Sequence, residues 1–174
     1  AVGRRIRSAV DAAEAGMAKL ETLLPHLPDP VPSNSRGADA VQRHAIVLDL
    51  VLGPRTDWFD GESLELLQQQ CWQVTQQSNR VGLRLLGEKP LQRATGFQGR
   101  ELPSEGTALG ALQVPANGQP VLFLADHPLT GGYPVIGCVA PHHLDLAAQL
   151  PPGVFVRFKL MAPFAEIPLV GAGA

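Results

Sequence analysis

The sequence predicts a mainly β fold, either a barrel or a sandwich, that carries a few short helices. Short apolar runs recur throughout residues 45–160, and turn-forming pairs such as Asn117-Gly118 and Gly131-Gly132 separate them. The chain has no strand–helix–strand alternation and no internal repeat. Glycine (18 residues) and proline (16 residues) make up about a fifth of the 174 residues, which predicts many turns. These observations favour one β-rich domain over residues 45–160.

The segment before this domain has a helical pattern instead. From residue 4 to residue 24, apolar side chains recur at steps of four and three, so residues 1–24 are predicted to hold an amphipathic helix. Four prolines follow in the next sixteen residues. Residues 25–44 are therefore expected to be a linker or an extended surface loop. Residues 161–174 form a tail for which no element is predicted.

The strands of the domain follow from hydrophobicity and turn residues. Residues 45–52 are a nearly continuous apolar run closed by Gly53-Pro54, which predicts a largely buried strand. Residues 71–76 and 153–160 alternate between apolar and polar side chains, as half-buried strands do. Further strands are predicted at residues 82–86, 111–114, 120–125 and 134–140.

Two short helices are predicted between these strands. The first covers residues 63–70, and the second begins at Pro141 and runs through Leu150, because the missing N–H of proline costs nothing in a first turn. Residues 87–109 are expected to be mostly loops. His142 and His143 are adjacent, so they are expected to point in different directions on a solvated helical turn.

The composition excludes several classes of protein. Hydrophobic residues (45%) and charged residues (17%) exclude wholesale disorder. Lys and Arg (14) nearly balance Asp and Glu (16), so no electrostatic footprint for nucleic acid or an anionic membrane is present. Proline and glycine interrupt the longest uncharged stretches, so no transmembrane helix is predicted. With no signal-peptide core in the sequence, the protein is expected to be cytoplasmic.

The cysteines and the nucleotide motifs limit the possible chemistry further. Cys71 and Cys138 lie among apolar neighbours, which predicts buried thiols in a reducing compartment, while a disulfide between them stays open. No Cys or His pair has zinc-site spacing, so no metal site is predicted. Walker A and G-x-G-x-x-G patterns are absent from the sequence, so this chain offers no recognisable ATP site of its own.

The segment 126–134 is the densest group of polar residues and glycines. Thr130, Gly131 and Gly132 lie between two apolar runs and can expose backbone N–H groups to a carboxylate or an oxyanion. Tyr133 adds a hydroxyl donor, and Asp126 adds a base or an anchor, so these two are the candidate catalytic residues. The alternative is a structural hairpin in which the glycines only permit an unusual backbone.

Two other polar clusters interrupt the β pattern. Asn79 and Arg80 lie at a predicted turn, where the guanidinium of Arg80 could bind a carboxylate through two hydrogen bonds or be an ordinary turn residue. Glu105 and Gln113 are weaker candidates for substrate contact. No Ser/His/Asp or Cys/His nucleophilic arrangement is evident in the sequence.

Four segments carry a resemblance to a known family: SNRVGLRL (78–85), ELPSEG (101–106), GALQVP (110–115) and ADHPLTGGYPVIG (125–137). Together they resemble the C-terminal half of the KipA/PxpC family. Its members are described as the second subunit of allophanate hydrolase, the C-type subunit of 5-oxoprolinase, or the biotin-dependent carboxyltransferase domain of urea amidolyase. VLGPRTDWF (51–59) and PGVFVRF (152–158) extend the resemblance over residues 46–160.

The resemblance implies a cyclophilin-like β-barrel that works beside a KipI/PxpB-type subunit, with a PxpA-type subunit as a further candidate partner. It implies that ATP is used through the complex, and that biotin takes part if the reaction is carboxyl transfer. The substrates of the family share a planar amide or ureido group, which the N–H donors of the 126–134 segment, Arg80 and Tyr133 could hold. His127-Pro128-Leu129 departs from the Arg-Gln-Thr type of sequence in other members, and members are about twice as long as this chain.

The residues and the resemblance leave three functions open. The first is the C-type subunit of an ATP-dependent amidohydrolase or carboxyltransferase complex that acts on a small cyclic amide or ureido substrate, such as 5-oxoproline, allophanate or urea. The second is a KipA-type regulatory protein that antagonises a kinase inhibitor. The third, a prolyl isomerase, rests on fold analogy alone.

Overall fold

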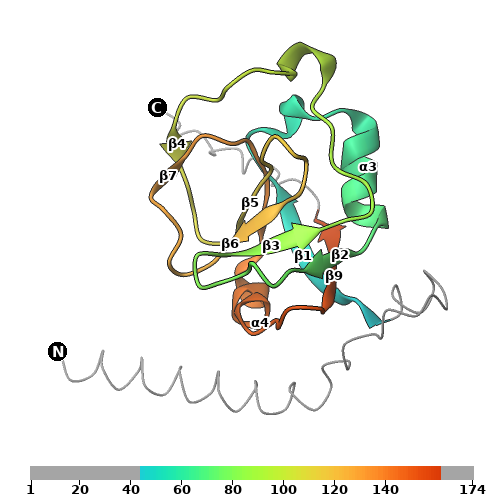
Figure 1. Cartoon of the computed structure of the whole chain (residues 1–174), viewed down its shortest axis with the longest axis vertical. Coiled ribbons are helices and arrows are strands. Elements are labelled where there is room, and N and C mark those ends of the chain that lie inside the picture. The colour runs from blue at the N-terminus through green and yellow to red at the C-terminus, as the bar shows by residue number, and fades with distance from the viewer. Residues whose placement is uncertain (1–43, 162–174) are drawn as a thin grey trace, which may run out of the picture.

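Seven strands pair edge to edge until the last one meets the first, as the computed structural model shows for residues 44–161 (Figure 1). In chain order the strands are β1 (Ile46–Leu52), β2 (Trp72–Val74), β3 (Gly82–Leu86), β5 (Ala111–Gln113), β6 (Val121–Phe123), β8 (Val135–Val139) and β9 (Phe155–Leu160). They are hydrogen-bonded in the order β1-β8-β5-β6-β3-β2-β9, and β9 closes the barrel on β1. The predicted mainly β fold is confirmed, and the structure contains a strand within each range predicted to be one.

The closing pair is the one parallel contact in this barrel, whose other neighbours run antiparallel. Its register runs from Ile46 opposite Val156 to Leu50 opposite Leu160. Leu48, Leu50 and Val156 are fully buried, and Phe158 is nearly so. Side chains alternate between the two faces of a strand, so the apolar alternation of residues 153–160 supplies one wall of the core.

Helix α3 (Gly61–Gln69) covers one side of the barrel and packs near β9. Asp60 caps its start, because the carboxylate accepts a hydrogen bond from the Ser63 N–H at 2.8 Å. The indole N–H of Trp72, which is fully buried, donates to the carbonyl of Leu67 at 3.2 Å. This bond satisfies the polar atom of the largest core side chain and ties the helix to β2.

The second predicted helix is divided in two. A 3-10 turn, η4 (Pro141–His143), leads into a short α-helix, α4 (Leu144–Ala148), before Pro151. Pro141 lies at the start of the turn, as predicted. Within residues 44–161 no helix has the length and apolar character needed to cross a membrane.

Two very short strands were not predicted. β4 (Glu105–Gly106) and β7 (Thr130–Gly131) pair antiparallel and form a separate sheet, here called the small sheet, at one end of the molecule (Figure 1). They fall in segments expected to be loops, because a two-residue strand has no hydrophobic alternation to reveal it. The predicted helix at residues 1–24, nearly all of the linker and nearly all of the tail lie outside the described residues.

Packing in the barrel wall predicts that alanine substitution at two strand glycines changes the free energy of unfolding by different amounts. A Cβ on Gly137 in β8 would lie 2.8 Å from Cγ of Leu50 and 2.9 Å from the carbonyl oxygen of Val51, whereas a Cβ on Gly106 would have no neighbour within 4 Å. Gly137→Ala is therefore expected to lower the free energy of unfolding by about 1–3 kcal/mol, the usual cost of overpacking. Gly106→Ala should change it by less than about 0.5 kcal/mol. Urea denaturation of both variants measures the difference, and equal effects would contradict this packing.

Candidate functional site

The small sheet brings together segments that are far apart in the sequence. Glu105 lies opposite Gly131, and Gly106 lies opposite Thr130. The N–H of Thr107 extends the contact by donating to the carbonyl of Leu129 at 3.0 Å. Three predicted site residues, Glu105, Thr130 and Gly131, are therefore neighbours at this end of the molecule.

Glu105 is held by an arginine that the sequence analysis did not single out. Arg55, in the turn after β1, donates from Nε to Oε2 of Glu105 at 3.1 Å and from Nη2 to Oε1. The hydrogen bond from Arg55 lowers the pKa of Glu105 from its ordinary value, and partial burial opposes that shift. Glu105 is therefore an ionised anchor for the small sheet rather than a proton donor. Arg55 belongs to the VLGPRTDWF segment of the resemblance, which is the signal that could have identified it.

Gln113 is a predicted site residue that lies inside the protein, only 5% exposed. Its amide Nε2 donates to the carbonyl of Tyr133 at 3.1 Å. A Cβ on Gly131 would lie 2.6 Å from the same Nε2, so the amide occupies the space that a side chain at this position would need. Gln113 thus supports the backbone on both sides of Gly132.

The backbone of Gly131 and Gly132 differs from that of an anion nest. Both lack positive φ, which among the described residues is found at Gly99, Gly110, Gly118 and Gly153. A nest built from alternating right- and left-handed residues is therefore not formed here. Gly131 is required for space instead, while a Cβ on Gly132 would find only the Leu102 carbonyl oxygen, at 3.4 Å.

Arg80 and Asp126 form a second group of predicted residues. The guanidinium donates from Nε to Oδ2 of Asp126 at 2.8 Å and from Nη2 to Oδ1 at 3.3 Å. The carboxylate that Arg80 binds in this structure is therefore that of Asp126. Asn79 supports the same turn, because its Oδ1 accepts the N–H of Val81 at 2.9 Å. Both charged side chains are well exposed, so the pair adds little to stability.

A cavity of about 470 Å³ adjoins the loop between β7 and β8, and we call it the cationic cavity. Its lining includes Gly132, Tyr133, two arginines, Arg93 and Arg100, and one carboxylate, Glu101. Neither arginine was predicted from the sequence, because both lie in the stretch expected to be mostly loops. The signal for Arg100 is its position directly before the ELPSEG segment.

The arginines of this cavity are positioned by an aromatic pair. Trp58 and Phe97 stack with ring centroids 4.7 Å apart. The guanidinium carbons of Arg93 and Arg100 lie 5.4 and 5.9 Å from the Trp58 ring, and Arg93 Nη1 donates to the carbonyl of Arg100 at 2.6 Å. Neither arginine forms an ion pair with a carboxylate of residues 44–161. Two guanidinium groups and the half-exposed Tyr133 can therefore bind an anionic group such as a carboxylate.

Both cysteines are free thiols, so the disulfide left open by the sequence is not formed. Cys71 and Cys138 are partly buried, and desolvation raises the pKa of each thiol. This makes them poor nucleophiles at neutral pH.

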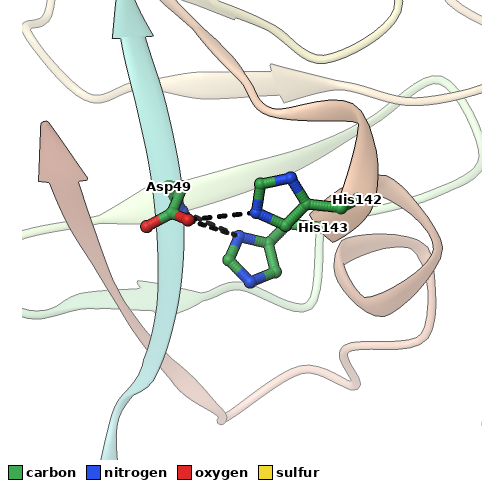
Figure 2. A group of neighbouring side chains, drawn as sticks. All are labelled: Asp49, His142 and His143. Carbon is green, nitrogen blue, oxygen red and sulfur yellow. Dashed lines mark hydrogen bonds and ion pairs between the residues drawn. The ribbon is translucent and has the colours of Figure 1, made fainter. Parts of the chain in front are cut away.

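The expectation for His142 and His143 is only half right: the helical turn is there and His142 is exposed on it, but the two rings do not point in different directions. Both rings point toward the carboxylate of Asp49 on β1, as Figure 2 shows. Nε2 of His142 lies 3.0 Å from Oδ2 of Asp49, and the N–H of Asp49 donates to Nδ1 of His143 at 2.9 Å. Adjacent residues diverge on a regular helix, but here they lie in a 3-10 turn that the Ala140 N–H connects to the Asp49 carbonyl at 2.9 Å.

Fold and site together define a class, a small closed β-barrel domain with a cavity lined by two arginines. The profile of the carboxyltransferase domain, subdomains A and B, matches residues 10–160, and the chain therefore belongs to this family.

Named relatives agree with this assignment. The chain is 42% identical over 106 residues to the C-type subunit of 5-oxoprolinase from Escherichia coli, a match that covers 61% of this chain and 33% of that protein. It is 34% identical over 107 residues to urea amidolyase of Saccharomyces cerevisiae, covering 59% of this chain and 6% of that protein. The crystal structure of urea amidolyase from Kluyveromyces lactis superposes with a TM-score of 0.62 at 27% identity, over 68% of this chain and 8% of that one. The chain thus matches about a third of the length of the bacterial relative.

The Arg55–Glu105 pair predicts how acid affects stability. The pKa of Glu105 is lower in the folded state than the roughly 4.3 of an unfolded chain. Its stabilising contribution is therefore present above that value and is lost as the pH falls through the folded-state pKa. Glu105→Gln should unfold at lower urea concentration than the parent at pH 7, and the difference should shrink as the pH is lowered below about 4.3. Glu101→Gln, which removes an exposed carboxylate, should show no such difference, and a difference for Glu105→Gln that does not change with pH would contradict the assignment.

Proposed function

We propose that the chain is the C-type subunit of an ATP-dependent amidohydrolase complex that acts on a small cyclic amide bearing a carboxylate, with 5-oxoproline as its substrate. The observation that carries the substrate class is the pair of guanidinium groups that line the same cavity as Gly132 and Tyr133. The 42% identity to the C-type subunit of a bacterial 5-oxoprolinase supports the reaction class.

Different residues of the cavity bind the carboxylate and the amide of the substrate. Arg93 and Arg100 hold the substrate carboxylate, because guanidinium geometry matches it. The hydroxyl of Tyr133 and the N–H of Gly132 donate to the amide carbonyl, where negative charge develops when the ring opens. Among the two residues predicted as catalytic, Tyr133 lines the cavity. Asp126 acts through its pair with Arg80 and positions the start of the loop.

The proposed activity requires partner subunits. The resemblance implies a KipI/PxpB-type subunit and a PxpA-type subunit, and ATP enters through the complex because this chain carries no phosphate-binding motif. Carboxyl transfer to urea from carboxybiotin is a second candidate, favoured by the likeness to the yeast urea amidolyases. Urea carries no carboxylate, so the two arginines give it less to bind. The KipA-type regulatory alternative has no support among the relatives named above.

Arg100→Gln tests the carboxylate site. In the assembled complex, loss of one charge-assisted hydrogen bond of about 1.5–3 kcal/mol should raise KM for 5-oxoproline about 10–100-fold and leave kcat nearly unchanged. Arg84→Gln, at an exposed arginine on β3, is the matched control and should keep the parent KM. Steady-state kinetics and melting temperatures of both variants give the answer. If KM stays at the parent value in a folded Arg100→Gln complex, the proposed carboxylate site is wrong.

The dependence on partners is tested with the chain alone. We expect the purified chain to neither bind nor hydrolyse ATP, and to gain activity on 5-oxoproline only with the other subunits. Equilibrium binding of labelled ATP and release of inorganic phosphate are the measurements. Saturable ATP binding by the isolated chain would overturn the division of labour proposed here.

A further inference from the structure

A group of three side chains lies away from the cationic cavity. Asp49, His142 and His143 meet where β1 passes the helical turn after β8 (Figure 2). In Figure 1 the adjoining helix α4 lies at the bottom of the barrel, whereas β4 and β7 lie at its upper left. The geometry points to a binding site for a divalent transition-metal ion of the zinc type, with Asp49, His142 and His143 as its protein ligands.

The distances suit a single ion. Oδ2 of Asp49 is 3.0 Å from Nε2 of His142 and 3.9 Å from Nδ1 of His143, and all three atoms lie within 4.8 Å of one another. Two ligands on a tetrahedral zinc ion with bonds of about 2.0–2.1 Å are separated by about 3.3 Å. The two separations from Asp49 bracket this value. The two histidine nitrogens lie at most 4.8 Å apart, so the side chains would have to approach one another by up to about 1.5 Å to share one ion.

The backbone holds the ligands in place before an ion binds. Asp49 lies in the middle of β1, and its carbonyl accepts the N–H of Ala140 at 2.9 Å, directly before the turn that carries both histidines. The Asp49 N–H donates to Nδ1 of His143, which requires an unprotonated Nδ1, the form that binds metal. The ion competes with this N–H for the same lone pair. His142 and Asp49 are therefore the principal ligands, and His143 is the weaker third one.

The chemistry of the ligands selects the kind of ion. The group offers one carboxylate oxygen, from Asp49, and two imidazole nitrogens, from His142 and His143. Two imidazoles with one carboxylate suit zinc and its neighbours, whereas magnesium and calcium prefer oxygen ligands throughout. The His142 side chain is 57% exposed, so water can complete the coordination. Such an ion would connect β1 with the segment η4–α4.

Calorimetric titration of the full chain with zinc chloride tests the site. The parent chain should bind one more ion than His142→Gln, or bind it at least about tenfold more tightly. Asp49→Asn keeps the side-chain shape and should weaken binding to a similar extent, and His143→Gln should weaken it less. His127→Gln removes a histidine outside this group and is the matched control, so it should bind like the parent. Magnesium chloride should give no binding at these residues.

A thermal melt distinguishes a lost ligand from a lost fold. In the presence of EDTA, His142→Gln should melt at the same temperature as the parent, because the ring is largely exposed. Zinc should raise the melting temperature of the parent by several degrees and that of His142→Gln by less. Equal zinc affinity and stoichiometry in the parent, Asp49→Asn and His142→Gln would overturn the proposal. So would a parent chain that gains no stability from saturating zinc.

Discussion

The parallel contact between β1 and β9 is the constraint on which the rest of the structure depends. It joins two strands from opposite ends of the domain over five residue pairs and closes the barrel around Leu48, Leu50 and Phe158. A contact between strands so distant in sequence has a high entropic cost, and burial of apolar side chains offsets it. Once β1 is held by β9, its other edge is available to β8.

This second edge of β1 positions the Arg55–Glu105 pair and the group formed by Asp49, His142 and His143. Beyond the strand, the N–H of Gly53 donates to Ile136 at 2.9 Å and that of Arg55 to Val135 at 3.3 Å, which brings Arg55 toward Glu105 and the small sheet. At the other end of the β1–β8 pair, the Ala140 N–H bonds to Asp49 and brings the two histidines to its carboxylate. One strand thus supplies an anchor at each end of the barrel.

Local signals in the sequence were sufficient for most of the fold. Each predicted strand depends on a run of apolar or alternating side chains. A pattern such as GVFVRFKL predicts a strand from neighbouring residues alone, without knowledge of the rest of the fold. The site was only partly predictable. The pairs Arg55–Glu105 and His142–Asp49 join residues 50 and 93 positions apart, and no local pattern encodes such a contact. The resemblance identified the 126–134 segment, but the support that Gln113 gives its backbone involves a residue twenty positions away. The positions of Arg93 and Arg100 depend likewise on packing against Trp58 and Phe97.

The parallel closure has a consequence for engineering by circular permutation. Because β1 and β9 run in the same direction, the chain enters the closing pair beside Val156 and leaves it beside Leu50. These points are separated by the length of the paired segment, roughly 16 Å at about 3.3 Å per residue. A peptide that joined residue 161 back to residue 45 would have to run along the outside of the barrel and would need at least about five residues. New termini are better opened in the exposed turn at Gln76-Gln77, where no barrel strand is interrupted.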